Sequence, residues 1–400
     1  MKRYLLSIVL VLFAVAGIGS YYAYGASDRL PEFRLAAVQG DGAIGDRIRL
    51  SGSYGGRMFS QFLAVSAQGS DYDRDRSIFH KWRERVRLAD ADPEIAALIR
   101  EHRRFMRGKP RYAWALNNLH KDREWLIFAD AKLYQRGPSA WDLAATIEML
   151  SLSGGEVRRY DVLLDQTSAA AGGYVQDVAR IGEKLHLIVQ IGYDRYADYI
   201  LDMNGRLIEK VILSGEEDGP ENGGGRYITA FPSSSGDALA MAVTKTDPET
   251  GAARKISFHR YHYASGSISK LAEIPIDQKE GEKVAVYAAD DQFAVLIHDE
   301  QTARWRLLPA RGGTSLPPEQ SAKAGSLGGK EIKTAYVADG IAFLLMKNGS
   351  RHVVAAIDLS SGALLYSGRV ELAGAAAHEE EELALLRLNN LYVAPREGSD

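Results

Sequence analysis

Hydrophobic residues along most of this chain come in short runs that are typical of β-strands. Clear examples are residues 184–190, 238–243, 292–297 and 341–346, and polar or turn-forming residues bound each run. Runs of about six residues, rich in branched and apolar side chains, predict strands. Because helical spacing of apolar positions is poor after residue 110, we expect an all-β body over residues 111–400.

A weak repeat groups these strands. Turns that contain Gly154, Gly205, Gly266, Gly312 and Gly362 recur at intervals of 51, 61, 46 and 50 residues. A period of about 40 to 50 residues with several strands in each unit is typical of propeller blades, because a lone four-stranded sheet cannot bury both faces. The chain therefore predicts a β-propeller of about six blades, while a β-sandwich or two smaller β domains stay open as alternatives.

The two ends of the body are expected to meet in one blade, which removes an exposed sheet edge. The last two strands would form a hairpin about the Asn389–Asn390 turn, and strands within residues 27–55 would complete that blade. The strands expected in it are Leu383–Leu388, Leu391–Ala394, Phe33–Val38 and Arg47–Leu50.

Residues 56–110 break the strand pattern and predict an insertion of two helices. One side of a first short helix would carry Ile78, Phe79, Trp82 and Val86. The second begins with Asp92 as N-cap and Pro93 as first helical residue. Its apolar stripe contains Ile95, Leu98, Ile99, Phe105 and Met106, and it ends before Gly108 and Pro110.

The N-terminus, residues 1–26, predicts a signal anchor that crosses a membrane once. Lys2 and Arg3 precede 23 uncharged residues, Tyr4–Ala26, which as a helix would span about 34 Å. Basic residues stay on the cytoplasmic side, so we expect the body outside the cytoplasm. A cleaved signal peptide ending near Gly25, which would leave the body secreted, stays open.

Composition excludes several kinds of chemistry. The chain has no cysteine, which rules out disulfides, thiolate metal sites and thiol nucleophiles. Its formal net charge of −3 argues against a nucleic-acid binder. Serine-elbow, zincin and P-loop patterns do not occur, so we predict no catalytic, cofactor-binding or metal-ligating residue and no cofactor.

Basic residues gather on the second predicted helix. Residues 81–111 carry ten Lys or Arg against five Asp or Glu, and the candidate interaction residues here are Arg100, Arg103, Arg104, Arg107, Lys109 and Arg111. They could dock an acidic protein partner, anionic lipid headgroups or a cell-wall polymer. Alternatively, they only complement the dipole at a helix C-terminus.

Two aromatic segments could form ligand contacts or could pack within the sheets. Tyr193 and Tyr196 are candidate stacking residues for a sugar or peptide, although a packed sheet surface explains them equally well. In Phe258–Tyr263, Tyr261 and Tyr263 share one face of the strand, so aromatic packing between strands is the expected role.

Turns with an aspartate before a glycine, Asp202–Gly205 and Asp358–Gly362, lie between apolar strands. In this respect residues 111–395 resemble the degenerate repeats of quinoprotein-like bacterial β-propellers. The tryptophan-docking repeats of true quinoproteins are missing, so the resemblance implies the fold and neither a cofactor nor site residues.

These observations predict a membrane-anchored, extracytoplasmic, non-catalytic module for interaction or sensing. The alternative is an extracytoplasmic hydrolase or lyase that acts on carbohydrate, with carboxylates in the central funnel of the propeller.

Overall fold

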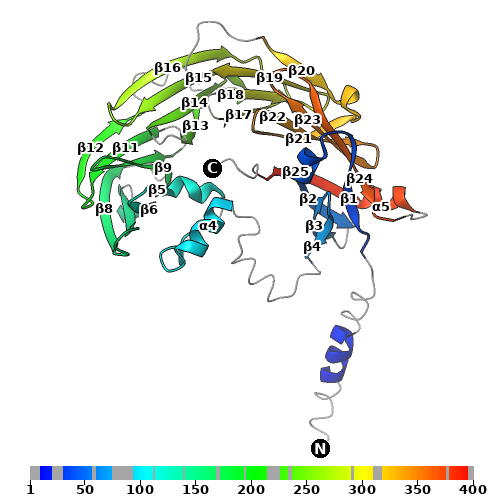
Figure 1. Ribbon diagram of the computed structural model, residues 1–400, viewed down its shortest axis with the longest axis horizontal. Helices are drawn as coiled ribbons and strands as arrows, with labels where there is room; N and C mark the ends of the chain where they lie inside the picture. The colour runs from blue at the N-terminus through cyan, green and yellow to red at the C-terminus, as the bar shows by residue number, and fades with distance from the viewer. Residues whose placement is uncertain are drawn as a thin grey trace, which may run out of the picture.

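The structure is a computed structural model that describes residues 10–19, 30–55, 60–73, 93–110, 113–137, 140–167, 172–192, 195–213, 226–232, 237–289, 292–309, 318–374 and 378–394. The described chain is almost entirely β-structure with few helices. Six antiparallel sheets stand around a common axis, which is a propeller-like arrangement (Figure 1).

We number the sheets as blades and give the strands of each from the axis outward. Blade I contains β25 (Leu386–Val393), β2 (Ile48–Gly55), β3 (Ser60–Ser66) and β4 (Gly69–Tyr72). Blade II contains β5 (Leu119–Lys121), β6 (Trp125–Gly137), β7 (Ala140–Ser151) and β8 (Val157–Thr167). Blade III contains β9 (Gly173–Ile181), β10 (Lys184–Ile191), β11 (Arg195–Asp202) and β12 (Leu207–Ile212).

The other three blades continue around the axis. Blade IV contains β13 (Arg226–Pro232), β14 (Ala238–Thr246), β15 (Ala253–His262) and β16 (Ser267–Pro275). Blade V contains β17 (Lys283–Ala289), β18 (Gln292–His298), β19 (Thr302–Pro309) and β20 (Gln320–Lys323). Blade VI contains β21 (Glu331–Ala338), β22 (Ile341–Asn348), β23 (Arg351–Asp358), β24 (Leu364–Leu372) and, as a fifth strand, β1 (Phe33–Gly40).

Short helices occur between and beside the blades. They are α2 (Gly42–Asp46), α4 (Pro93–Glu101), α5 (Glu379–Leu385) and the 3-10 helices η3 (Ala113–Asn118) and η4 (Ala324–Leu327).

The glycine repeat has a simple structural origin. Gly154, Gly205, Gly266 and Gly362 all lie in turns between the third and fourth strands of successive blades, and Gly312 lies outside the described residues. Gly205, Gly266 and Gly362 have φ values of 78°, 65° and 72°, which favour glycine because it has no Cβ. The repeat therefore measures one blade, as predicted.

The blade that joins the chain ends differs from the prediction. Leu386–Val393 is one continuous strand, with a register shift that leaves Asn389 unpaired, so there is no Asn389–Asn390 hairpin. The shift keeps Leu386, Leu388 and Leu391 on one buried side of the strand, because a bulge changes the alternation of side chains. Blade I thus takes its inner strand from the C-terminus and three strands from residues 48–72, whereas β1 extends blade VI.

Residues 56–110 are likewise not a purely helical insertion. They contain β3 and β4, whose buried residues Leu63, Val65 and Tyr72 belong to the core between blades I and VI. The helix expected after Asp92 is present as α4. The first expected helix, with Ile78 to Val86, lies outside the described residues.

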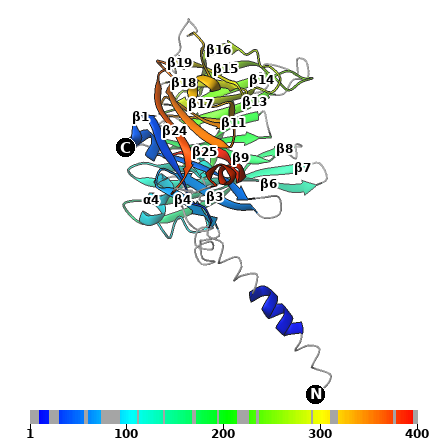
Figure 2. The same cartoon turned by 90° about the vertical axis from the view of Figure 1, so that its right-hand side faces the viewer.

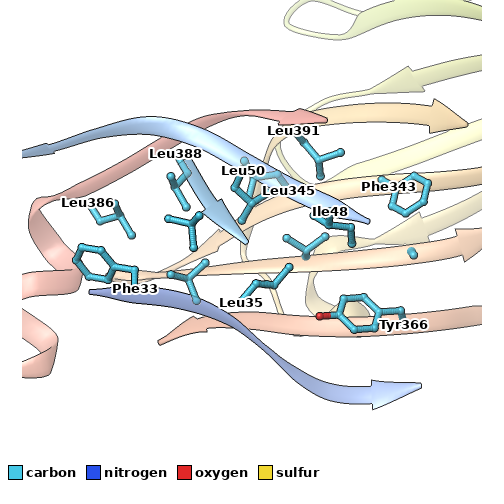
Figure 3. Packing of buried hydrophobic residues seen from close by; sticks show 14 of the residues in the cluster. Phe33, Leu35, Ile48, Leu50, Phe343, Leu345, Tyr366, Leu386, Leu388 and Leu391 are labelled. Atoms are coloured by element: carbon cyan, nitrogen blue, oxygen red, sulfur yellow. The ribbon is translucent and has the colours of Figure 1, made fainter. Parts of the chain in front are cut away.

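Apolar cores join five pairs of neighbouring blades: VI with I, II with III, V with VI, III with IV, and IV with V. The core between blades VI and I is drawn in Figure 3, where Phe33 lies near Leu386 at one end and Tyr366 lies toward Ile48 and Phe343 at the other. Strands such as β10 and β22 are buried on both faces, which explains their nearly continuous apolar sequence.

Residues 10–19 near the N-terminus are helical (Figure 2). Within the described ranges no helix combines the length and apolar character needed to cross a membrane.

Candidate functional site: an arginine surface at the open junction

The junction between blades I and II differs from the other five, because no apolar cluster of described residues joins these two sheets. The face of blade I that points away from blade VI is instead accessible and carries both polar and aromatic side chains. Its β2–β25 register sets Arg49 opposite Tyr392 and Ser53 opposite Arg387, and paired residues share a face. Phe62 on β3 also lies opposite Ser53 and is 67% exposed.

On the other side of this junction, residues 93–110 cover blade II. Leu98, Phe105 and Met106 are buried against Leu126 and Phe128 of β6. The alternate residues of β6, such as Ile127, face blade III, so this helical segment takes the place where a neighbouring blade would pack. In Figure 1, α4 lies in the opening between blades II and I.

Lys109, predicted as an interaction residue, is a structural one. It is only 8% exposed, and its Nζ donates to the Phe105 carbonyl and lies 2.5 Å from Glu148 Oε2 on β7. The ammonium also sits 3.9 Å from the centre of the Phe105 ring. The prediction that Lys109 lies on the surface is therefore wrong. A long lysine side chain can be buried where a carboxylate and a carbonyl both accept hydrogen bonds from its ammonium group.

Four predicted residues do form a common surface. Arg100, Arg103, Arg104 and Arg107 are all exposed. Arg100 lies in the last turn of α4, and Arg103, Arg104 and Arg107 follow it in a run of turns in which the Met106 N–H donates to the His102 carbonyl. We call these four residues the arginine surface.

The arginine surface has unused hydrogen-bonding capacity. Ion pairs in this region belong to other residues: Lys121 lies 3.0 Å and His102 3.7 Å from Glu101. None of the four arginines pairs with an acid among the residues that the structure describes. Each guanidinium can therefore bind an external anion without first breaking an internal contact.

The remaining predicted residues do not join this surface. Tyr196 is 2% exposed and donates its hydroxyl to the Ile228 carbonyl at 2.7 Å, so its assignment as a surface residue is wrong. The carbonyl of the neighbouring blade satisfies the hydroxyl, and burial of the ring contributes to the core between blades III and IV. Tyr193 and Arg111 lie outside the described residues.

A buried polar network, not predicted from the sequence, links blades III and IV. His186 Nδ1 lies 2.7 Å from Asp198 Oδ2, and the Tyr261 hydroxyl donates to the same oxygen at 2.7 Å. Tyr263 donates its hydroxyl to Asp177. Burial raises the pKa of Asp177 to about 6 and the pKa of Tyr263 well above its usual value.

This network has the residue types of an acid–base site but lacks access for a substrate. Its five members are at most 8% exposed, and each side chain on blade IV reaches a carboxylate on blade III. The shared face of Tyr261 and Tyr263 was correctly predicted. An aspartate such as Asp198 inside an apolar strand was the available signal, since a buried carboxylate needs donors from elsewhere in the fold.

The inner strands, which border the axis, expose aromatic rather than acidic side chains. Tyr174, Tyr227 and Tyr392 are 62%, 56% and 58% exposed. Asp177 and Glu331 are the inner-strand carboxylates in the described ranges, and they lie on the non-neighbouring blades III and VI. The described residues also include no group of three or more His, Asp and Glu that could hold a metal ion.

Comparison with known proteins gives similarity of shape alone. No protein-family model and no curated protein sequence matches the chain. Solved structures that align with it include the periplasmic gluconolactonase PpgL of Pseudomonas aeruginosa, at 12% identity over 87% of this chain and 99% of that one, with a TM-score of 0.30. The WD40 domain of SCAP from fission yeast aligns at 12% identity over 64% of this chain and 58% of that one, with a TM-score of 0.32.

An uncharacterized protein of Listeria monocytogenes aligns at 10% identity over 63% of this chain and 66% of that one, with a TM-score of 0.30. The propeller-like architecture of this chain rests on its own six sheets.

Proposed function

We propose that this protein is a non-catalytic interaction module that docks an acidic segment of a partner protein on the arginine surface. The observation that carries the proposal is a group of four exposed arginines that have no acidic partner among the described residues, held at the junction that no described apolar cluster joins. We also propose that residues 1–26 anchor the module in a membrane, with the body outside the cytoplasm.

The anchoring of the arginine surface favours specific docking over nonspecific charge attraction. Leu98, Phe105, Met106 and Lys109 fix one side of the segment to blade II, so the opposite side is presented on a supported backbone. A preorganised surface loses less conformational entropy when it binds. A guanidinium on it can bind a carboxylate in a bidentate geometry.

The open face of blade I, across the junction, also carries basic residues, with Asp71 of β4 as the acidic residue on the same face. Blade I exposes Arg49 and Arg387 on its open face. Like charges disfavour direct contact between the two sides, whereas an acidic occupant would be attracted by both. Charge complementarity therefore favours a partner rich in Asp and Glu.

The alternative, a hydrolase or lyase, needs two carboxylates close to one scissile bond. Asp177 and Glu331 do not meet this condition, since they lie on separate blades and Asp177 is engaged by Tyr263. No observation on the described residues favours this alternative.

The test is binding of a fluorescent glutamate-rich peptide to the full-length protein, followed by anisotropy. We expect binding that weakens as the salt concentration rises. The variant Arg103→Ala/Arg104→Ala should bind at least about tenfold more weakly, since the loss of even one charge-assisted hydrogen bond costs about 1.5 to 3 kcal/mol. The matched control, Arg34→Ala/Arg206→Ala, removes the same charge elsewhere and should bind like the unaltered protein.

Two results would contradict the proposal. One is equal weakening by both double variants, which would indicate only a net-charge effect. The other is binding of anionic lipid vesicles, dependent on Arg103 and Arg104, with no binding of the acidic peptide.

A further inference from the structure

A cavity of about 290 Å³ opens between blades IV and V, away from the arginine surface. The last residue of β16 and the two residues after it form one wall, and β18, β19 and the residue before β20 form the rest. Its lining consists of Pro275, Ile276, Asp277, Val295, Ile297, Arg304, Trp305, Arg306 and Glu319. The cavity therefore combines an apolar floor with a charged rim.

The apolar part of the cavity is rigid. Val295 and Ile297 are 2% and 3% exposed and belong to the core that joins blades IV and V. Trp305, between the two arginines of β19, packs on the other face of that strand, where its Nε1 donates to the Leu359 carbonyl of blade VI at 3.0 Å and so fixes the strand that carries the rim. Pro275 and Ile276 continue this surface toward solvent, which leaves room for a small aliphatic group.

The two arginines of the rim are not equivalent. Arg304 is satisfied, since it donates to Glu282 Oε2 and to the Asp277 carbonyl, both at 2.8 Å. Arg306 Nε lies 3.3 Å from Glu319 Oε2, yet this buried N–H has no hydrogen-bond acceptor. A buried donor without an acceptor is uncommon, and a bound ligand would supply the missing partner.

Glu319 limits the charge of such a ligand. Its carboxylate lies within 3.5 Å of Arg304 and 3.3 Å of Arg306, and its side chain is 31% exposed. A simple anion would approach Arg306 against the charge of Glu319, and a simple cation would approach Glu319 against Arg306. A zwitterion can satisfy both groups at once.

We propose that this cavity binds an aliphatic α-amino acid. Arg306 receives its carboxylate, Glu319 receives its ammonium group, and Pro275, Ile276, Val295 and Ile297 contact its side chain. The step is reversible binding without chemistry, and it would give the module a sensing function separate from docking at the arginine surface.

The test is calorimetric titration of the full-length protein with three probes of similar shape: L-leucine, isocaproate, which lacks the ammonium group, and isopentylamine, which lacks the carboxylate. We expect L-leucine to bind at least about tenfold more tightly than either analogue, because each analogue lacks one of the two charge-assisted contacts with Arg306 and Glu319. Arg306→Met should weaken L-leucine binding about tenfold or more.

The second variant is Glu319→Gln, at an exposed side chain where folding is not at risk. It should weaken binding of L-leucine and leave binding of isocaproate unchanged or stronger. Arg206→Met and Glu183→Gln, on the distant blade III, are the matched controls and should have no effect. Absence of L-leucine binding, equal binding of isocaproate, or retention of full L-leucine affinity in Glu319→Gln would each overturn the proposal.

Discussion

The junction between blades III and IV and the junction between blades I and II use polar residues in opposite ways. In the first, Asp177 and Asp198 are enclosed and accept hydrogen bonds from tyrosines of the neighbouring blade, and the buried His186 is paired with Asp198. In the second, arginines on both sides stay in solvent. Buried polar groups add specificity to an interface that apolar residues already stabilise. Exposed polar groups keep a surface available for a partner.

The largest expected effect on stability is at the junction between blades III and IV. Asp198→Ala should lower the free energy of unfolding by about 3 to 5 kcal/mol, because His186 and the Tyr261 hydroxyl each lose a buried partner at about 1 to 3 kcal/mol. Urea denaturation at pH 7 measures the change. Glu280→Ala, at an exposed turn, is the control, and a similar loss in both variants would contradict the distinction.

The next largest effect on stability concerns the contact that holds the arginine-bearing segment against blade II. Lys109→Ala should lower the free energy of unfolding by about 2 to 3 kcal/mol, because Glu148 and the Phe105 carbonyl lose a nearly buried ammonium group. Hydrogen exchange should also accelerate in residues 98–106 before it does so in blade III. Unchanged exchange there would mean that the salt bridge does not hold the segment.

The pH dependence of stability separates the two junctions further. The pKa of Asp177 is raised to about 6 in the folded protein from 3.8 when unfolded. Protonation therefore favours the folded state. This contribution, about 2 to 3 kcal/mol, is complete below pH 3.8 and is lost as pH rises through 6. Asp177→Asn should abolish it, as a comparison of urea midpoints from pH 4 to 7 with those of the unaltered protein would show. Parallel midpoint curves for the two proteins would refute the assignment.

The smallest expected effect is at the open junction. Replacing Arg100, Arg103, Arg104 and Arg107 together by alanine should change the free energy of unfolding by only about 0.5 kcal/mol or less, because exposed side chains without partners contribute little to the folded state. Thermal unfolding of this variant beside Lys109→Ala provides the measurement. A large loss of stability would show that the arginines are structural and would remove the basis of the proposed docking surface.

Much of the architecture could be predicted because each blade repeats a local pattern. The turns with Gly205, Gly266 and Gly362 mark the same position in three blades, and short apolar runs between such turns are strands whatever surrounds them. The blade that joins the chain ends could be predicted only in outline. Apolar residues on both sides of Asn389 and Asn390 fit a hairpin and a bulged strand equally well, and contact with β2 decides between them.

The candidate site could be predicted by residue type but not by exposure. Arg103 and Lys109 are both cations on the same segment, and local sequence does not distinguish them. Their difference depends on Glu148, 39 residues farther along the chain, which draws Lys109 inward. Tyr196 is a similar case, because the Ile228 carbonyl that accepts its hydrogen bond belongs to the next blade.

The amino-acid sequence by itself determined the strand-rich body, the length of the repeat, the basic helical segment and the absence of cysteine chemistry. These features depend on propensities and spacings that act over a few residues. Only the tertiary structure decided which junction stays open, which cation is buried and where Arg306 lacks an acceptor. Those outcomes depend on contacts between residues far apart in the chain, whose geometry exists only once the blades have packed.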